Sequence, residues 1–454
     1  MMLMSINPAT EEVVGETIEL TESELESKLA KAESAFLEWR EKNIYERATL
    51  MQSVASSMRD NKEELARIAV MEMGKPISQA IAEVEKCAWA AEHYALETAN
   101  YLAPEVIDTE ATSSYVRFDP KGVILAVMPW NFPYWQVMRF VAPALMAGNV
   151  GLLKHASSTQ LSAIAFEKVF IDSGFPNGVF TNLALSSGRI ASLIADPRVK
   201  AIALTGSENA GSKVAETAGK YIKKSVLELG GSDPFIVLAD ADLESACDTA
   251  VLARVQNNGQ SCIAGKRFIV EDPIYEEFIA KLKTRYENLK LGDPMDPSVN
   301  VGPIATSVGR EELEGQVKKS MEAGARLVIG GKKKDGKGFF FEPTILADIT
   351  PEMSVGSEET FGPVAAVMRA KDREDAVRIA NSSRYALGAS LWTRNLDIAE
   401  GIAQKLTSGA VFVNTMVKSD PRMPFGGEGV SGFGRELGSY GIKEFVNIKS
   451  VWIH

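Results

Sequence analysis

Histidine and cysteine are scarce in this chain of 454 residues, which has three of each. The histidines are His93, His155 and His454, and the cysteines are Cys87, Cys247 and Cys262. So few histidines disfavour a His-rich metal site and a Ser/His/Asp triad, and proton transfer would fall to carboxylates or lysines. Because the cysteines lie far apart in the sequence, we predict neither a disulfide framework nor a zinc site, and no bound metal.

Long apolar runs and clusters of positive charge are also missing. The chain has no stretch of about 18 uncharged apolar residues, which a membrane-spanning helix needs, and residues 1–10 lack the features of a secretory signal. The net charge is −11, and the longest cationic run is Lys332-Lys333-Lys334, whereas nucleic-acid binding relies on clustered cations. We therefore expect a cytoplasmic protein with no membrane and no nucleic-acid partner.

Apolar residues are plentiful, at 45% of the chain, and 454 residues exceed what one core can hold, so we expect two or three domains. Residues 20–102 have a helical pattern that opens with a capping-box candidate at Thr21 and Glu24. Short apolar runs at 122–128, 149–153, 199–204 and 225–229 then alternate with helical stretches at 161–172 and 208–224. This alternation is typical of the α/β class, with a parallel sheet and helices on both faces.

A second α/β series begins after a boundary near residues 230–233. An apolar run at 235–238 leads into the acidic segment 240–244, which predicts the start of a helix, and the series continues to about residue 425. The remaining residues predict a glycine-rich loop, a short helix at 438–445 and a strand at 446–453 that could pair with the edge of another subunit.

Two glycine-containing motifs are candidates for phosphate binding. Residues 427–432 match GxGxxG, but a dinucleotide fingerprint needs a strand before it, a helix after it and an acidic residue about twenty positions later. Here the chain ends 22 residues on, so we interpret this match as a loop near the site. Leu204-Thr205-Gly206-Ser207 is the better candidate, because an apolar strand runs through small residues into a helix and leaves amides free for pyrophosphate.

Covalent chemistry is indicated by one thiol and one carboxylate. The polar turn 256–261 presents Cys262, and the apolar run 225–227 ends at Glu228. Since a free thiol has a pKa of about 8.5, it needs a base to attack an electrophilic carbon. The alternatives are a buried packing role for Cys262, which its polar neighbours disfavour, and a solvated strand end for Glu228. Cys87 and Cys247 lie in helical surroundings and are expected to be packing residues.

Seven motifs follow one another along nearly the whole chain. They are Pro129-Trp130-Asn131-Phe132-Pro133, Leu153-Lys154, Thr205-Gly206-Ser207, Leu227-Glu228-Leu229-Gly230-Gly231, Gly259-Gln260-Ser261-Cys262, Glu359-Thr360-Phe361-Gly362-Pro363-Val364 and Pro424-Phe425-Gly426-Gly427. In this order they resemble the aldehyde dehydrogenase superfamily. Residues 130–139, 154–157 and 417–421 give a finer resemblance, to bacterial-type succinate-semialdehyde dehydrogenases that prefer NADP.

The resemblance implies an aldehyde dehydrogenase-like fold, with two Rossmann-like doubly wound α/β domains and a small β oligomerisation domain. The dinucleotide-binding domain would comprise residues 1–103 and 121–230, the catalytic domain residues 231–427, and the oligomerisation domain residues 104–120 and 428–454. We expect a homodimer or a homotetramer.

The resemblance also assigns the catalytic roles. Cys262 would be the nucleophile and Glu228 the base, first for the thiol and then for the water that hydrolyses a thioester. The Asn131 amide and the Cys262 backbone N–H would hold the oxyanion, where one donor typically contributes about 3–4 kcal/mol. From sequence alone, without the resemblance, Asn131 is better interpreted as a turn former between two prolines. The expected cofactor residues are Trp130, Lys154, His155, Ser157, Gly206, Ser207, Leu229, Glu359 and Phe361.

Cofactor choice depends on Lys154 and Ser157. In NAD-preferring relatives a glutamate at the position of Ser157 bonds the adenosine ribose, and it would repel a 2'-phosphate by about 4 kcal/mol at 4 Å with an effective dielectric near 20. Serine removes this obstacle, and Lys154 supplies a cation with His155 as a further donor, so NADP is favoured and NAD stays possible. The alternative is a solvated lysine and a serine that caps the next helix.

Substrate choice is expected to depend on Arg139, at the position where semialdehyde dehydrogenases bind a carboxylate, with Ser419 as a second contact. Arg139 could instead form a structural salt bridge. Gln256 departs from relatives that carry arginine there. The leading function is NADP-dependent oxidation of succinate semialdehyde to succinate through a thiohemiacetal and a thioester. The alternatives are glutarate semialdehyde or another aldehyde, and a CoA-acylating reaction.

Overall fold

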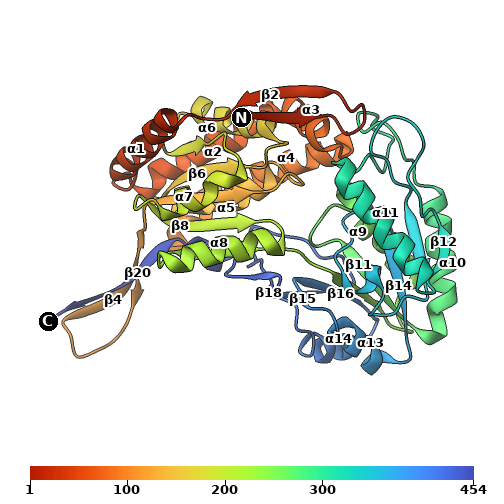
Figure 1. The fold of residues 1–454 in the computed structure, drawn as a ribbon. Coiled ribbons are helices and arrows are strands. Elements are labelled where there is room, and N and C mark those ends of the chain that lie inside the picture. Colours follow the sequence, from red (N-terminus) through yellow and green to blue (C-terminus); the bar gives the residue numbers. More distant parts are fainter.

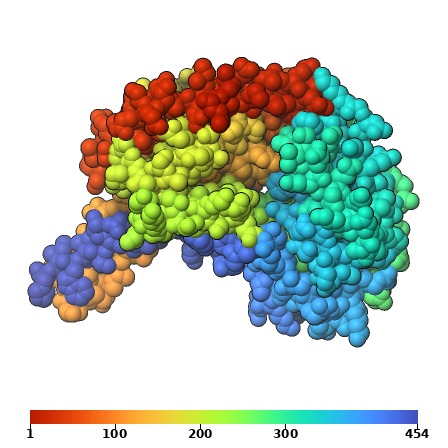
Figure 2. Space-filling model, viewed as in Figure 1, coloured from red at the N-terminus to blue at the C-terminus, as the bar shows by residue number.

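The computed structural model describes residues 1–454, and its strands form three main sheets. Figure 1 shows two α/β bodies side by side, one containing the first half of the chain and the other the second half, with an arm that carries the C-terminus. Figure 2 shows this arm projecting away from the rest of the molecule. Among the helices, none combines the length and the apolar character that a membrane crossing requires.

The first hundred residues are mainly helical, as predicted. The helices are α1 (Glu22–Trp39), α2 (Ile44–Asp60), α3 (Lys62–Met73) and α4 (Ile77–Tyr101). The capping box is confirmed, because the Thr21 side chain accepts from the N–H of Glu24 while the Glu24 carboxylate accepts from the N–H of Thr21. An antiparallel hairpin of β1 (Met2–Ile6) and β2 (Val13–Ile18) precedes these helices and was not predicted.

The first large sheet has the order β19-β9-β8-β5-β6-β7. Its strands are β5 (Val123–Met128), β6 (Val150–His155), β7 (Phe180–Asn182), β8 (Val199–Thr205), β9 (Lys224–Glu228) and β19 (Gly432–Phe433), and its helices are α5 (Trp135–Met146), α6 (Gln160–Asp172), α7 (Ile190–Ala195) and α8 (Glu208–Lys220). All pairs are parallel except β19 with β9. The predicted helix at 208–224 ends early, because Ile222 takes a left-handed φ of 55° and Lys224 already begins β9.

The second large sheet has the order β12-β13-β14-β11-β10-β16-β17, with only β12 and β13 antiparallel. Its strands are β10 (Asp233–Val237), β11 (Gly265–Glu271), β12 (Arg326–Ile329), β13 (Thr344–Ala347), β14 (Val364–Ala370), β16 (Gly388–Trp392) and β17 (Ala410–Val413). The helices of this half are α9 (Leu243–Val255), α10 (Tyr275–Glu287), α11 (Ser307–Glu322), α12 (Ser354–Ser357), α13 (Arg373–Ala380) and α14 (Leu396–Ala403). The predicted helix start is confirmed at Asp242, whose carboxylate accepts from the N–H of Ser245.

The arm is a three-stranded antiparallel sheet of β3 (Glu105–Val106), β4 (Ser113–Pro120) and β20 (Val446–Ile453), and α15 (Gly438–Lys443) precedes its last strand. All eight residues of β20 pair with β4 of the same chain, which leaves β20 as an edge strand. The GxGxxG match forms no phosphate loop. It contains β18 (Glu428–Gly429), which pairs with β15 (Tyr385–Ala386), and it ends at the first residue of β19, which joins the first large sheet.

Candidate active site

The carboxyl ends of the parallel strands in the first sheet gather many of the predicted site residues. β5 leads to Trp130 and Asn131, β8 leads to Gly206 and Ser207, and β9 ends at Glu228. β5 and β8 are neighbours although β6 and β7 lie between them in the chain, so the strand order reverses at this point. In open α/β sheets, ligands bind in the crevice at such a point.

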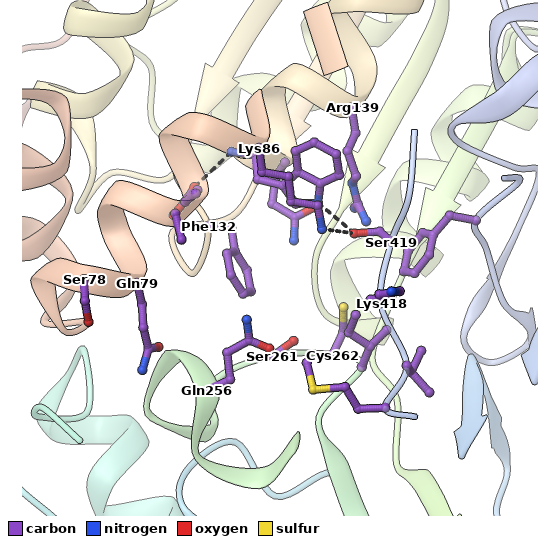
Figure 3. A pocket seen from close by; sticks show the side chains of 18 residues that line it. Ser78, Gln79, Lys86, Phe132, Arg139, Gln256, Ser261, Cys262, Lys418 and Ser419 are labelled. Atoms are coloured by element: carbon purple, nitrogen blue, oxygen red, sulfur yellow. Dashed lines mark hydrogen bonds between the residues drawn. The ribbon is translucent and has the colours of Figure 1, made fainter. Parts of the chain in front are cut away.

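Two cavities meet at Cys262, which lines both of them together with Gln136. The first cavity, of about 260 Å³, contains the three predicted substrate residues, Arg139, Gln256 and Ser419, and is shown in Figure 3. The second, of about 230 Å³, is lined among others by Trp130, Asn131, Gly206, Ser207, Leu229, Glu359 and Phe361. The structure therefore brings the predicted nucleophile to the junction between the predicted substrate residues and most of the predicted cofactor residues.

The turn before Cys262 has an unusual backbone conformation. Asn257, Asn258 and Gly259 all have positive φ, at 57°, 58° and 73°. The side-chain amide of Asn258 donates to two backbone carbonyls at 2.8 and 2.9 Å, and the buried guanidinium of Arg254 donates to the carbonyl of Gly259 at 2.6 Å. Such conformations persist only where the surroundings hold them, and they cluster at functional sites. These contacts fix the backbone conformation of the turn that precedes Cys262.

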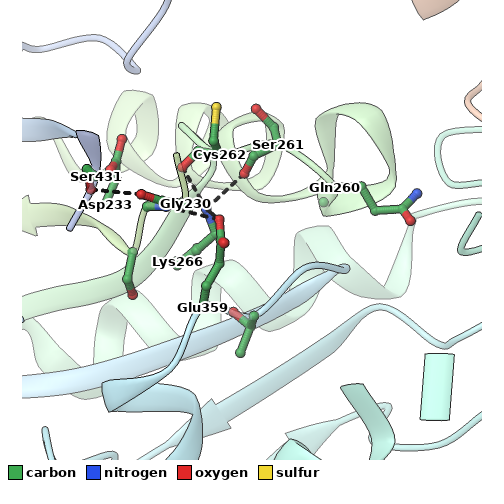
Figure 4. Close-up of polar contacts among 12 residues, drawn as sticks. Gly230, Asp233, Gln260, Ser261, Cys262, Lys266, Glu359 and Ser431 are labelled. Atoms are coloured by element: carbon green, nitrogen blue, oxygen red, sulfur yellow. Dashed lines mark hydrogen bonds and ion pairs between the residues drawn. The ribbon is translucent and has the colours of Figure 1, made fainter. Parts of the chain in front are cut away.

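Lys266 in β11 holds the backbone of Cys262 from the other side. Its buried ammonium donates to the carbonyls of Ser261 and Cys262 at 2.8 and 2.7 Å and lies 3.3 Å from a carboxylate oxygen of Glu359. The same Glu359 oxygen accepts from the N–H of Gly231 at 3.1 Å. Figure 4 shows this cluster, in which the sulfur of Cys262 points away from Lys266. The sequence had given no signal for Lys266.

The thiol of Cys262 is protonated in this arrangement. Burial raises its pKa to about 12, although the charges of Arg139 and Lys266 oppose that shift. Because the thiolate is the nucleophile, the reaction needs a group that removes this proton. Cys87 and Cys247 are buried free thiols, as their predicted packing role requires.

Asn131 is buried beside Cys262 in the second cavity. Its Nδ2 donates to the carbonyl of Gln260 at 3.0 Å, and its own backbone carbonyl accepts from the amide of Asn257 at 2.8 Å. Since a side-chain amide has two N–H groups, one is left to donate to an oxygen near Cys262. Asn131 can therefore act as an oxyanion donor.

Glu228 is only 2% exposed, so it is not a solvated strand end. Neither carboxylate oxygen has a hydrogen-bond partner. Burial raises its pKa well above the ordinary glutamate value, Glu436 raises it further, and Arg139 and Arg435 lower it. Glu228 is close enough to raise the pKa of Cys262 in turn. An unpaired carboxyl with a raised pKa beside a thiol is a candidate general base, although it does not line either cavity.

Arg139 lines the first cavity, but its charge is already paired. Its Nε lies 2.8 Å from a carboxylate oxygen of Glu436, and its Nη2 donates to Thr205 Oγ1 at 3.4 Å. The guanidinium also lies 4.8 Å from the centre of the Phe425 ring. This geometry matches the structural salt bridge that the sequence left open as the alternative to carboxylate binding.

Lys154 and Ser157 lie at the carboxyl end of β6 and in the turn after it. Lys154 is 6% exposed, so it is not a solvated lysine. Burial lowers its pKa, and Glu19 is the one charged group that raises it. Ser157 does not cap the next helix, since Thr159 occupies the N-cap position of α6. Both alternatives to a cofactor role are therefore disfavoured.

His155, a predicted cofactor residue, has its ring turned into the protein interior. It is fully buried, and its Nε2 lies 2.9 Å from the carbonyl of Pro133. Its Nδ1 lies 2.8 Å from the N–H of Ala156 and 2.7 Å from Thr159 Oγ1. Both ring nitrogens are thus used inside the protein, and burial lowers the pKa to about 4, so the ring is neutral.

Comparisons with known proteins agree with this geometry. The model of the aldehyde dehydrogenase family matches residues 2–451. An NADP(+) succinate-semialdehyde dehydrogenase 1 of Mycobacterium bovis is 47% identical over 456 residues, with 100% of both chains covered. An NADP(+) succinate-semialdehyde dehydrogenase of Mycobacterium avium is 47% identical over 457 residues, covering 100% of this chain and 97% of its own.

One of the similar solved structures is succinic semialdehyde dehydrogenase from Streptococcus pyogenes in complex with NADP+. It is 38% identical, covers 99% of each chain and gives a TM-score of 0.97. These comparisons confirm the predicted family resemblance and the predicted fold class.

Proposed function

This chain belongs to the aldehyde dehydrogenase family, and on that premise we propose that it oxidises succinate semialdehyde to succinate with NADP as the hydride acceptor. The observation that carries the proposal is the position of Cys262 at the junction of the two cavities, one lined by Asn131 and the predicted cofactor residues and the other by cations. The names of the Mycobacterium and Streptococcus relatives support the choice of aldehyde and cofactor.

The reaction begins with attack by the Cys262 sulfur on the aldehyde carbon. The thiol proton must leave first, because burial holds the pKa at about 12, and Glu228 is the carboxylate that can take it. The new C–S bond converts the carbonyl into an oxyanion. The free N–H of the Asn131 amide and the backbone N–H of Cys262 donate to this oxygen, a role that typically contributes about 3–4 kcal/mol for one donor.

The first half-reaction ends when the tetrahedral carbon loses a hydride, which NADP accepts when it is bound, and a thioester with Cys262 is left. Before the second half, Glu228 releases the thiol proton to solvent and is again ionised. It then takes a proton from water, and the resulting hydroxide attacks the thioester carbon. The C–S bond breaks, the thiol of Cys262 regains a proton, and the carboxylic acid is released. Lys266 keeps the Cys262 backbone in place through both halves.

The residues present fit NADP. Gly206 and Ser207 stand at the start of α8, whose N-terminal N–H groups favour a pyrophosphate. Lys154 is a buried cation at the carboxyl end of β6, and Glu19 is the one charged group that raises its pKa. Ser157, in the turn after β6, brings no negative charge to this end of the strand. Lys154 and Ser157 would hold the 2'-phosphate, while Glu359 and Phe361 line the cavity beside Cys262 where the nicotinamide would lie.

We also propose that the enzyme is a cytoplasmic homo-oligomer with the predicted domain division. All three cysteines are free thiols, as is usual in a reducing compartment.

β20 is the edge strand of the arm and carries the exposed Ile448, Trp452 and Ile453. An unpaired apolar edge is a template for another chain. In the proposed domain division, residues 428–454 belong to the oligomerisation domain, and β19 is the one strand among them that pairs with the first large sheet.

A single set of assays tests the proposed function. The purified protein is given succinate semialdehyde, glutarate semialdehyde or butanal, each with NADP or NAD, and cofactor reduction is followed by absorbance. We expect the highest kcat/KM with succinate semialdehyde and NADP, and succinate as the product. A Cys262→Ala variant should be inactive but folded. The absence of reduction with every aldehyde would overturn the enzymatic assignment, and acyl-CoA formation on addition of CoA would overturn the hydrolytic step.

A further inference from the structure

Lys86 points into the first cavity from α4, a helix that none of the motifs includes. Its Nζ donates to Ser419 Oγ at 2.9 Å and lies 4.2 Å from the centre of the Trp135 ring. Trp135 Nε1 donates to the same hydroxyl oxygen at 3.0 Å. Figure 3 shows both hydrogen bonds converging on Ser419. The ammonium is therefore held between an aromatic face and a hydroxyl at one end of the cavity.

The hydrogen bonds among Lys86, Trp135 and Ser419 leave N–H and O–H donors free at this end of the cavity. Because Ser419 Oγ accepts from both Lys86 and Trp135, its own O–H is free to donate. The Lys86 ammonium has two further N–H groups. Glu83 is the only acidic residue that lines the cavity, and its carboxylate already accepts from the N–H groups of Tyr134 and Trp135 and pairs with Lys75. Such an end of a cavity recognises an anion.

Arg139 and Lys86 both line this cavity, but they differ in their partners. Arg139 is paired with the buried Glu436, whereas Lys86 makes its hydrogen bond to a neutral hydroxyl. Asp420, one of the acids that act on Lys86, forms a salt bridge with Arg422. Burial and the charge of Arg139 together lower the pKa of Lys86 to about 8. A carboxylate placed beside Lys86 would stabilise its charged form.

We propose that Lys86, together with the Ser419 hydroxyl, binds the terminal carboxylate of the substrate, and that Arg139 is a positioning residue paired with Glu436. The inference rests on the proposed function and names the residue that selects an acidic aldehyde. The cavity runs from Lys86 to Cys262 and, at about 260 Å³, lies below the size of typical pockets for drug-sized ligands, which are about 300–1,000 Å³. It suits a short aldehyde with its aldehyde carbon at Cys262 and its carboxylate at Lys86.

The test compares two aldehydes of equal carbon number, succinate semialdehyde and the uncharged butanal. Lys86→Met should lower kcat/KM for succinate semialdehyde relative to butanal by roughly tenfold to hundredfold, mainly through KM, since a charge-assisted hydrogen bond is lost. Lys86→Arg should recover part of this ratio. Lys418→Met, which removes an exposed cation of the same cavity, is the matched control and should change the ratio by less than about threefold.

Binding of succinate, measured by calorimetry, separates this inference from the proposed function because it needs no turnover. We expect the wild-type protein to bind succinate and Lys86→Met to bind it at least about tenfold more weakly. If the wild type binds succinate through Lys86 but does not oxidise succinate semialdehyde, the proposed function fails and the anion site stands. Equal succinate binding by the wild type and Lys86→Met, no binding by either, or an unchanged aldehyde ratio would overturn the role of Lys86.

Discussion

The Nε of Arg139 lies 2.8 Å from a carboxylate oxygen of Glu436, and the two side chains are only 2% and 5% exposed. This ion pair joins α5 to the segment before α15, next to Glu228. Glu436 raises the pKa of Glu228 and Arg139 lowers it, so the pair sets the electrostatic environment of the proposed base. Arg139 is therefore paired with a carboxylate of its own chain, that of Glu436.

The first prediction concerns the stability of this pair. Arg139→Met leaves Glu436 buried without its partner, which should lower the free energy of unfolding by about 3–5 kcal/mol. The pKa of Glu436 is already raised by burial, so without Arg139 the side chain must be protonated to stay buried, and the loss should be smaller at acidic pH than at neutral pH. Urea denaturation at several pH values measures this.

The double variant Arg139→Met/Glu436→Leu is the control for the ion pair. Replacing both charges by apolar groups should recover most of the stability, because no buried charge is left. If the single variant is as stable as the wild type at neutral pH, the two side chains do not form a stabilising pair.

Much of the fold and the centre of the site could be predicted from local sequence. The strand at 446–453 and the capping box at Thr21 follow from short patterns. The residues that the sequence missed act through distant partners. Lys86 and Ser419 are 333 positions apart, and no periodicity in a helix indicates which residue such a lysine will meet. The position of His155 at a strand end does not indicate that its ring turns inward, where it lies within hydrogen-bond distance of the Pro133 carbonyl and the Thr159 hydroxyl.

The second prediction concerns the cofactor. Ser157→Glu places a carboxylate near the strand end that carries Lys154, where it would repel a 2'-phosphate by about 4 kcal/mol at 4 Å and an effective dielectric near 20. Since about 1.4 kcal/mol corresponds to a factor of ten, kcat/KM with NADP should fall by up to roughly a thousandfold, while NAD is affected far less. Steady-state kinetics with both cofactors measures the ratio. An unchanged preference would show that Ser157 does not lie near the 2' position.

The third prediction concerns the pH dependence. A carboxyl accepts a proton only in its ionised form, and the pKa of Glu228 is raised well above its ordinary value by burial. The kcat/KM should therefore rise with pH, and the rise should begin well above about 4.3, where an unperturbed glutamate ionises. Glu228→Gln should remove this rise and lower kcat by roughly 10²–10⁴-fold. The control is Glu216→Gln, on the exposed side of α8, which should keep the wild-type pH profile. If Glu228→Gln also keeps the wild-type pH profile, Glu228 is not the base.

The last prediction concerns the turn that presents Cys262. Gly259 has a φ of 73°, and a Cβ at this position would lie 2.3 Å from the carbonyl oxygen of Gly362, so neither the conformation nor the space accepts a side chain. Gly259→Ala must move the turn, at a cost of about 1–3 kcal/mol from overpacking and about 1–2 kcal/mol from the left-handed backbone. Because Cys262 follows three residues later, kcat should fall more than NADP affinity does. Gly219→Ala in α8, where a Cβ would meet nothing within 4 Å, is the matched control and should be neutral or slightly stabilising. Thermal unfolding of both variants measures the stability cost, and single-turnover kinetics measures the rate of the chemical step. A wild-type rate in Gly259→Ala would mean that the turn does not position the sulfur of Cys262.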